Sequence, residues 1–173
     1  MPALIHLNGP TGVGKSTIAA RYAAEHPKTL NLDADEIVRL VGGWQDDFFG
    51  TVGLVRPLAL AMAATHLSSG HDVVMPQLVA RRPERDRFAE TAHAAGADYL
   101  EIMLLAPADV AVRRFQGRDH HIDGAVEALG GAAMIRRIRD QFTRYLTPES
   151  VVIETGEADA EQTYQAVLAA LGR

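Results

Sequence analysis

Short apolar runs alternate with longer helix-forming runs along the whole chain. The apolar runs with the length of β-strands cover residues 3–8, 29–33, 71–76, 99–105 and 151–154. Helix-forming runs cover residues 16–25, 83–95, 107–116, 132–145 and 159–171, and residues 35–69 are mainly helical with glycine and proline interruptions. Asp159 and Gln162 have the spacing of a capping box at the start of the last helix.

This alternation predicts an α/β fold, a three-layer α/β/α sandwich. Strands separated by helices imply right-handed crossovers, and these give a five-stranded parallel sheet with helices on both faces. Ligands of such sheets bind at the carboxyl ends of the strands. The rule brings together the segments 9–16, 33–35, 77–82 and 155–157, and we expect residues 1–173 to form one domain.

Residues 9–16 read Gly-Pro-Thr-Gly-Val-Gly-Lys-Ser and fit the pattern G-x-x-x-x-G-K-[ST] between a predicted strand and a predicted helix. Glycines allow the backbone to turn its N–H groups inward, and the helix N-terminus attracts an anion. Lys15 is expected to reach the β- and γ-phosphates, and the Ser16 hydroxyl to bind Mg²⁺. The sequence therefore predicts that a nucleoside triphosphate binds to Gly9, Thr11, Gly12, Val13, Gly14, Lys15, Ser16 and Thr17.

Two carboxylates follow the second predicted strand. If Asp33 and Asp35 leave an extended segment, they point to the same side of the chain. Asp33 is then expected to hold Mg²⁺, directly or through water, and Asp35 to accept a proton from an attacking hydroxyl or to orient it. The alternative is that Asp35 only caps the following helix.

Composition and charge narrow the class of protein. The net charge of −5 argues against a nucleic-acid partner, and the absence of cysteine excludes disulfides and Cys-ligated zinc. The chain shows neither a signal-peptide pattern nor an uninterrupted apolar run of about eighteen residues, so we expect a cytoplasmic protein with no membrane partner. Whether it is a monomer or a homodimer stays open.

The basic residues are mostly arginines, and only Lys15 and Lys28 are lysines. Arg114 and Arg118 lie four residues apart, on one helix face, where they can neutralise charge on a transferred phosphoryl group unless they are a solvated basic face. Bidentate arginine suits a carboxylate or phosphate, so we expect Arg39 and Arg82 to hold an anionic group of an acceptor. The other expected acceptor contacts are Trp44, Gln77 and Asp35.

These motifs resemble those of the small P-loop kinases of the shikimate kinase, gluconate kinase and chloramphenicol phosphotransferase group, within the AAA-type kinase family. The matching pieces are residues 9–17, Asp33-Ala34-Asp35, the pair Arg114 and Arg118, and Glu154-Thr155-Gly156. The resemblance implies a P-loop NTPase fold, with adenine near Thr155, Gly156 and Arg114. It also implies an acceptor-binding region over about 35–69 and a lid over about 117–131. The chain departs from that group at Gln77, where relatives commonly have Asp, Asn or a glycine-rich turn.

The motifs together predict an ATP-dependent phosphotransferase that moves the γ-phosphate of Mg-ATP to a hydroxyl of a small-molecule acceptor. A nucleoside monophosphate kinase is the alternative that the arginines at 81, 82 and 85 keep open, whereas the two aspartates favour a hydroxyl acceptor. A nucleotide-dependent switch is less favoured, because neither lysine lies in an Asn-Lys-x-Asp setting.

Overall fold

The computed structural model describes residues 1–117, 122–148, 150–156 and 159–172. Within these ranges a five-stranded sheet has the order β2-β3-β1-β4-β5. All pairings are parallel. The strands are β1 (Ala3–Asn8), β2 (Leu30–Asn31), β3 (Val73–Pro76), β4 (Asp98–Leu105) and β5 (Val151–Glu154). The predicted parallel sheet is confirmed, and β2 is shorter than predicted because the chain turns into a helix at residue 34.

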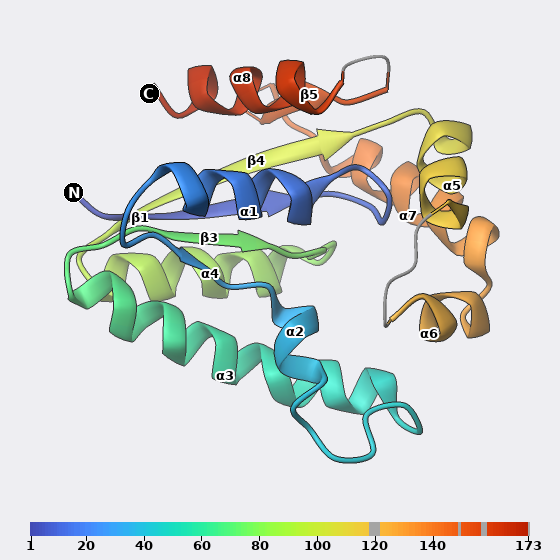
Figure 1. Cartoon of the computed structure of the whole chain (residues 1–173), viewed down its shortest axis with the longest axis horizontal. Helices are drawn as coiled ribbons and strands as arrows, with labels where there is room; N and C mark the ends of the chain where they lie inside the picture. Colours follow the sequence, from blue (N-terminus) through green and yellow to red (C-terminus); the bar gives the residue numbers. More distant parts are fainter. Residues whose placement is uncertain (118–121, 149, 157–158, 173) are drawn as a thin grey trace.

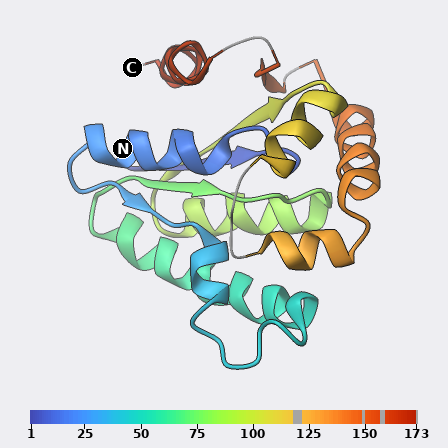
Figure 2. The same cartoon turned by 45° about the vertical axis from the view of Figure 1, so that its right-hand side comes forward.

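Helices cover both faces of this sheet (Figures 1 and 2). They are α1 (Lys15–Glu25), α2 (Ala34–Val38), α3 (Phe48–Ser68), α4 (Arg82–Ala94), α5 (Ala108–Gln116), α6 (Asp123–Ala128), α7 (Gly131–Tyr145) and α8 (Ala160–Ala170). Side chains of α1, α5 and α8 form one apolar cluster with the sheet, and side chains of α3 and α4 form another. The predicted three-layer α/β/α arrangement is confirmed.

Alternation along β1 explains the two clusters. Ile5 and Leu7 join the cluster of α1, α5 and α8, whereas Leu4 joins that of α3 and α4. In Figure 1 the arrowheads of β1, β3 and β4 point toward the side of the molecule where α5, α6 and α7 gather. The carboxyl ends of the central strands therefore open toward one group of helices, where the ligand is expected.

The segment expected to be a lid, about 117–131, contains a short helix. Residues 123–128 form α6, and Ile122 and Val126 are buried in the cluster of α1 and α5. Two apolar residues four apart bury one side of this short helix, a signal too brief to stand out in the sequence. Residues 118–121, which include the predicted catalytic Arg118, lie outside the described residues.

Helix α3 is long and apolar enough, by length and composition, to cross a membrane. It packs on the sheet through Val55, Ala59 and Ala63, which are buried. Core helices commonly meet the same criterion, so α3 is only weak evidence for a membrane span.

Candidate functional site

The motif at 9–16 forms the turn between β1 and α1. Gly9 and Gly12 have φ angles of 138° and 87°, in the region that favours glycine. A Cβ at Gly9 would overlap the carbonyl oxygen of Leu104, and one at Gly12 would overlap that of Ala111. Both glycines are therefore required twice, by backbone conformation and by the close approach of β4 and α5.

The N-terminus of α1 is open to an anion. Its N-cap, Gly14, offers no side-chain cap, and the first turn contains no acidic residue. The Lys15 ammonium donates hydrogen bonds to the carbonyl oxygens of Gly9 (2.9 Å) and Pro10 (2.8 Å), which hold it over the loop. The positive end of the α1 dipole, the backbone N–H groups of the loop and the Lys15 ammonium thus converge where the sequence predicts the phosphates.

Ser16 and Asp33 meet beside this helix end. The Ser16 hydroxyl donates to Asp33 Oδ2 at 2.8 Å, and Asp33 Oδ1 accepts from the backbone N–H of Asp35 at 3.1 Å. The described residues contain no group of three or more His, Asp or Glu side chains that could hold a metal. A hydroxyl and one carboxylate fit Mg²⁺, which commonly takes its remaining ligands from phosphates and water. The fold therefore brings together the two residues predicted to bind the metal.

The expected geometry of the acidic pair is wrong in one respect. The backbone of Asp33, the N-cap of α2, is extended, but Asp35 already lies in the first helical turn, so the two residues do not share one extended segment. The capping role considered for Asp35 thus belongs to Asp33. Asp35 follows Asp33 by two residues, and its backbone N–H donates to the Asp33 side chain. The action of Asp35 on an acceptor hydroxyl stays a prediction.

A cavity of about 370 Å³ lies against the other side of the phosphate loop. It is lined by Gly12, Val13, Gly14, Thr17, Ile18, Arg114, Thr155, Asp159, Ala160 and Thr163. Arg114 donates to the carbonyl oxygen of Thr155 (2.8 Å) and to its hydroxyl (3.3 Å). Gly156 approaches Pro107 too closely for a Cβ. Arg114 and Thr155 therefore shape the cavity where adenine is expected, and a role of Arg114 at the transferred phosphoryl stays a prediction.

The expected acceptor residues lie in different surroundings. Arg39 is exposed and pairs with Glu36 at 3.1 Å, whereas Trp44 is half-buried between the two main apolar clusters. Gln77 is buried, and its Oε1 has no hydrogen-bond partner. Arg82 lines a second cavity of about 810 Å³ with Arg85, Tyr99, Glu101 and Tyr145. Among the described residues, none that was predicted to bind phosphate or metal lines that second cavity, and the contact of Arg82 with an anionic group of the acceptor stays a prediction.

Sequence reasoning missed two groups of residues around the loop. Asp159, the N-cap of α8, and Thr163 within α8 line the cavity beside it. The sequence indicated only a helix cap at Asp159 and its position close after the predicted segment 155–157. Asn8 is fully buried and bonded to the loop after β3. Its signal was that Asn8 and His6, two residues apart and on one face, are the polar residues of a mainly apolar strand.

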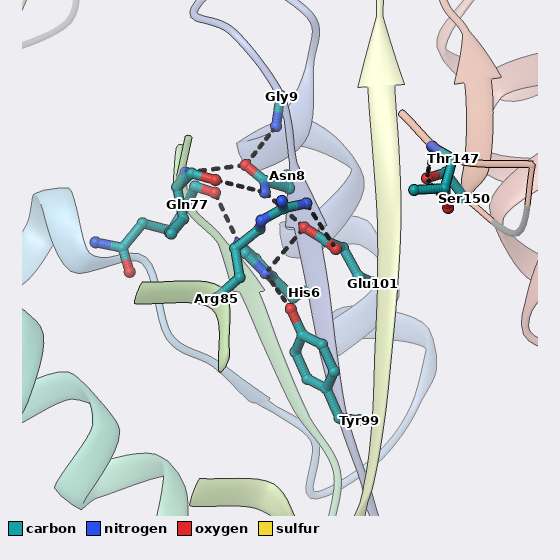
Figure 3. A network of polar contacts seen from close by, with 10 residues as sticks. His6, Asn8, Gly9, Gln77, Arg85, Tyr99, Glu101, Thr147 and Ser150 are labelled. Atoms are coloured by element: carbon teal, nitrogen blue, oxygen red, sulfur yellow. Dashed lines mark hydrogen bonds and ion pairs between the residues drawn. The ribbon is translucent and has the colours of Figure 1, made fainter. Parts of the chain in front are cut away.

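His6 is a buried, neutral histidine. Its Nε2 lies 2.9 Å from the carbonyl oxygen of Gln77, and its Nδ1 lies 2.9 Å from the Tyr99 hydroxyl (Figure 3). A carbonyl only accepts, so Nε2 holds the proton. Burial, followed by the positive charges of Lys15, Arg85 and Arg56, lowers the pKa of His6 to about 3 against the opposing effect of the Gln77 bond.

This shift predicts an acid-sensitive fold. Below the ordinary pKa of 6.5 the unfolded chain takes up a proton at His6 that the folded chain refuses until about pH 3. The free energy of unfolding should therefore fall between these values, by up to about 1.4 kcal/mol per pH unit from this group. In urea titrations from pH 7 to pH 4, the His6→Gln protein should lose stability less steeply than the wild type. Parallel pH dependences would contradict the assignment.

A comparison with protein families agrees with the fold and with the phosphate loop described above. The model of a protein family described as an AAA domain (AAA_33) matches residues 4–145. The chain belongs to this AAA domain family. The matched range contains the phosphate loop, Asp33, Gln77 and Arg114. A search of curated protein sequences found no match.

Solved structures share the fold over nearly the whole chain. The APS kinase of Mycobacterium tuberculosis in complex with AMPPNP and APS has a TM-score of 0.70 at 19% identity, covering 99% of this chain and 98% of that one. A putative kinase of Chloroflexus aurantiacus has a TM-score of 0.68 at 22% identity, covering 99% and 96%. A gluconokinase of Sinorhizobium meliloti has a TM-score of 0.59 at 18% identity, covering 99% and 92%. The AAA domain described above thus has the fold of a P-loop kinase.

Proposed function

We propose that this AAA domain is a Mg²⁺-dependent phosphotransferase that moves the γ-phosphate of ATP to a hydroxyl group of a small molecule. The observation that supports it most is the convergence of three features at one helix end. These are the uncapped N-terminus of α1, the Lys15 ammonium over the loop, and the Ser16–Asp33 contact at 2.8 Å.

Each residue has a defined part in this proposal. The loop binds the phosphates through backbone N–H groups and Lys15, while Arg114 and Thr155 border the cavity for the nucleoside. Ser16 and Asp33 hold Mg²⁺, which neutralises charge on the phosphate oxygens when bound. Asp35 orients the acceptor hydroxyl or accepts its proton.

The acceptor is proposed to bind between α2, the start of α3 and the end of β3. Gln77 supports this place because its side-chain oxygen is buried without a partner, and a hydroxyl of the acceptor would satisfy it. Trp44 packs beside the same region. Arg39, four residues after Asp35, is exposed and pairs with Glu36, and it is proposed to bind an anionic group of the acceptor beside this pair.

A nucleoside monophosphate kinase is the second candidate, favoured only by the arginines at 81, 82 and 85. Arg82 and Arg85 line the second cavity, whose described lining contains no predicted metal or phosphate ligand, and this weakens that candidate.

An acceptor screen tests the proposal. Purified protein is incubated with γ-labelled ATP, Mg²⁺ and either nucleoside monophosphates or a panel of sugars, polyols and hydroxylated antibiotics, and label transfer is measured. We expect label on a hydroxyl compound and dependence on Mg²⁺. Transfer only to nucleoside monophosphates would favour the second candidate. Binding of ATP with no transfer to any compound, together with altered affinity for a protein partner, would favour a switch.

A further inference from the structure

Asn8 is the last residue of β1 and lies directly before the phosphate loop. It is completely buried, and its amide makes four hydrogen bonds. Oδ1 accepts from the backbone N–H of Gly9 (2.8 Å) and of Val79 (2.9 Å). Nδ2 donates to the carbonyl oxygen of Val79 (2.9 Å) and to Glu101 Oε1 (2.7 Å). The backbone N–H groups only donate and the carbonyl and carboxylate only accept, so one amide orientation alone satisfies all four.

The network joins segments that are far apart in the sequence (Figure 3). Gly9 begins the phosphate loop, whereas Val79 lies in the connection between β3 and α4, two residues after Gln77. The backbone of that connection is also fixed by Gln77 N–H, which donates to the Leu7 carbonyl oxygen at 3.1 Å. In Figure 3 the Gln77 side chain points away from the network. Hydrogen bonds therefore join the connection after β3, which is proposed to contact the acceptor, to the loop that is proposed to bind the phosphates.

Glu101 of β4 links the Asn8 amide to Arg85 of α4. Its Oε1 accepts from Asn8, and its Oε2 lies 3.5 Å from Nη1 of Arg85 on α4. The side chains of Arg85 and Glu101 are only 18% and 24% exposed. A carboxylate in this place needs the donor of Asn8, and an acid at position 8 would put two carboxylates in contact.

We infer that Asn8 is a positioning residue that sets the phosphate loop against the 77–80 connection, with Glu101 as its anchor. The inference rests on the proposed function, because it assigns Asn8 to the arrangement of the same site. Because Asn8 is completely buried, its side chain offers no surface for direct contact with a nucleotide or an acceptor. Its effect reaches them through the backbone of Gly9 and Val79.

Four variants test the inference without an acceptor: Asn8→Ala, Asn8→Asp, Glu101→Gln and the double variant Asn8→Asp/Glu101→Gln. Asn31, the chain's other asparagine, is exposed on β2, so Asn31→Ala is the matched control. The dissociation constant for AMPPNP is measured by calorimetry, and amide exchange at Gly9 and Val79 by NMR. Melting temperatures show that each variant is folded.

We expect Asn8→Ala to weaken AMPPNP binding by about tenfold and to accelerate exchange at both amides, because two buried N–H groups lose their acceptor. Asn8→Asp should bind more weakly still, since its carboxylate meets Glu101. Glu101→Gln should stay near the wild type because its amide oxygen still accepts from Asn8. The double variant should regain part of the affinity lost in Asn8→Asp, since the amide introduced at position 101 donates to the new carboxylate.

Wild-type affinity in folded Asn8→Ala or Asn8→Asp would overturn the inference, as would a double variant no better than Asn8→Asp. If the wild type binds AMPPNP but phosphorylates no acceptor, only the proposed function fails, because the affinity comparison needs no acceptor. If Asn8→Ala does not fold, the AMPPNP affinities of Asn8→Asp and of the double variant still test the positioning role of Asn8.

Discussion

The Lys15→Met protein should lose phosphotransfer by about 10³-fold, because one preorganised cation that meets the phosphates is removed. It should also bind ATP more weakly. In the structure the ammonium is held over the loop by the carbonyl oxygens of Gly9 and Pro10, so it is already in place when the phosphates arrive. The fold should survive, since these contacts lie at the half-buried edge of the loop. Initial rates with Mg-ATP and melting temperatures measure both effects.

Lys28→Met is the matched control. Lys28 is the chain's other lysine, is exposed, and lies after α1, away from the loop. Its variant should transfer phosphate at the wild-type rate. Retention of full activity and ATP affinity by Lys15→Met would show that the loop does not grip the phosphates as described.

Asp35→Asn should lower kcat by about 10²- to 10⁴-fold while the affinity for ATP stays unchanged, because the amide cannot accept the proton of the acceptor hydroxyl. The cap that Asp33 makes on the Asp35 backbone N–H does not involve the substituted side chain. Helix α2 should therefore form as before. Steady-state kinetics with the acceptor found in the screen, beside AMPPNP binding, separate the two effects.

Glu36→Gln provides the comparison for Asp35→Asn. Glu36 lies next to Asp35 in α2, but its side chain is exposed and pairs with Arg39. Its variant should keep the wild-type kcat. If Asp35→Asn kept the wild-type kcat, Asp35 would have no catalytic role, and its place in the first turn of α2 would be structural only.

The parts of the site that depend on local sequence were predictable. The phosphate loop is recognised from its glycines and Lys15 because these residues act through their own backbone and their immediate helix. The alternation of strands and helices likewise predicts the layers, since each apolar face must be covered. The proximity of Ser16 and Asp33 was predictable because parallel strands end at the same edge of the sheet, and their binding of a metal stays a prediction.

The remaining parts depend on tertiary contacts that no local pattern encodes. Helix α2 has only five residues, too few for a helical period, so the extended geometry expected for Asp33 and Asp35 was wrong. Arg82 follows the right strand, but the direction of α4 brings it to the second cavity. Three of the four bonds of Asn8 join residues 71 and 93 positions away, a distance that sequence periodicity does not span.

The most direct test of the account is a calorimetric titration of AMPPNP into the wild type and into Asp33→Asn, each with and without Mg²⁺. We expect one nucleotide per chain, with Mg²⁺ tightening the binding to the wild type. That gain should be largely absent in Asp33→Asn, whose amide is a poorer ligand for a hard cation. An equal Mg²⁺ effect in both proteins, or no binding to the wild type, would contradict the assignment of this helix end as the Mg-ATP site.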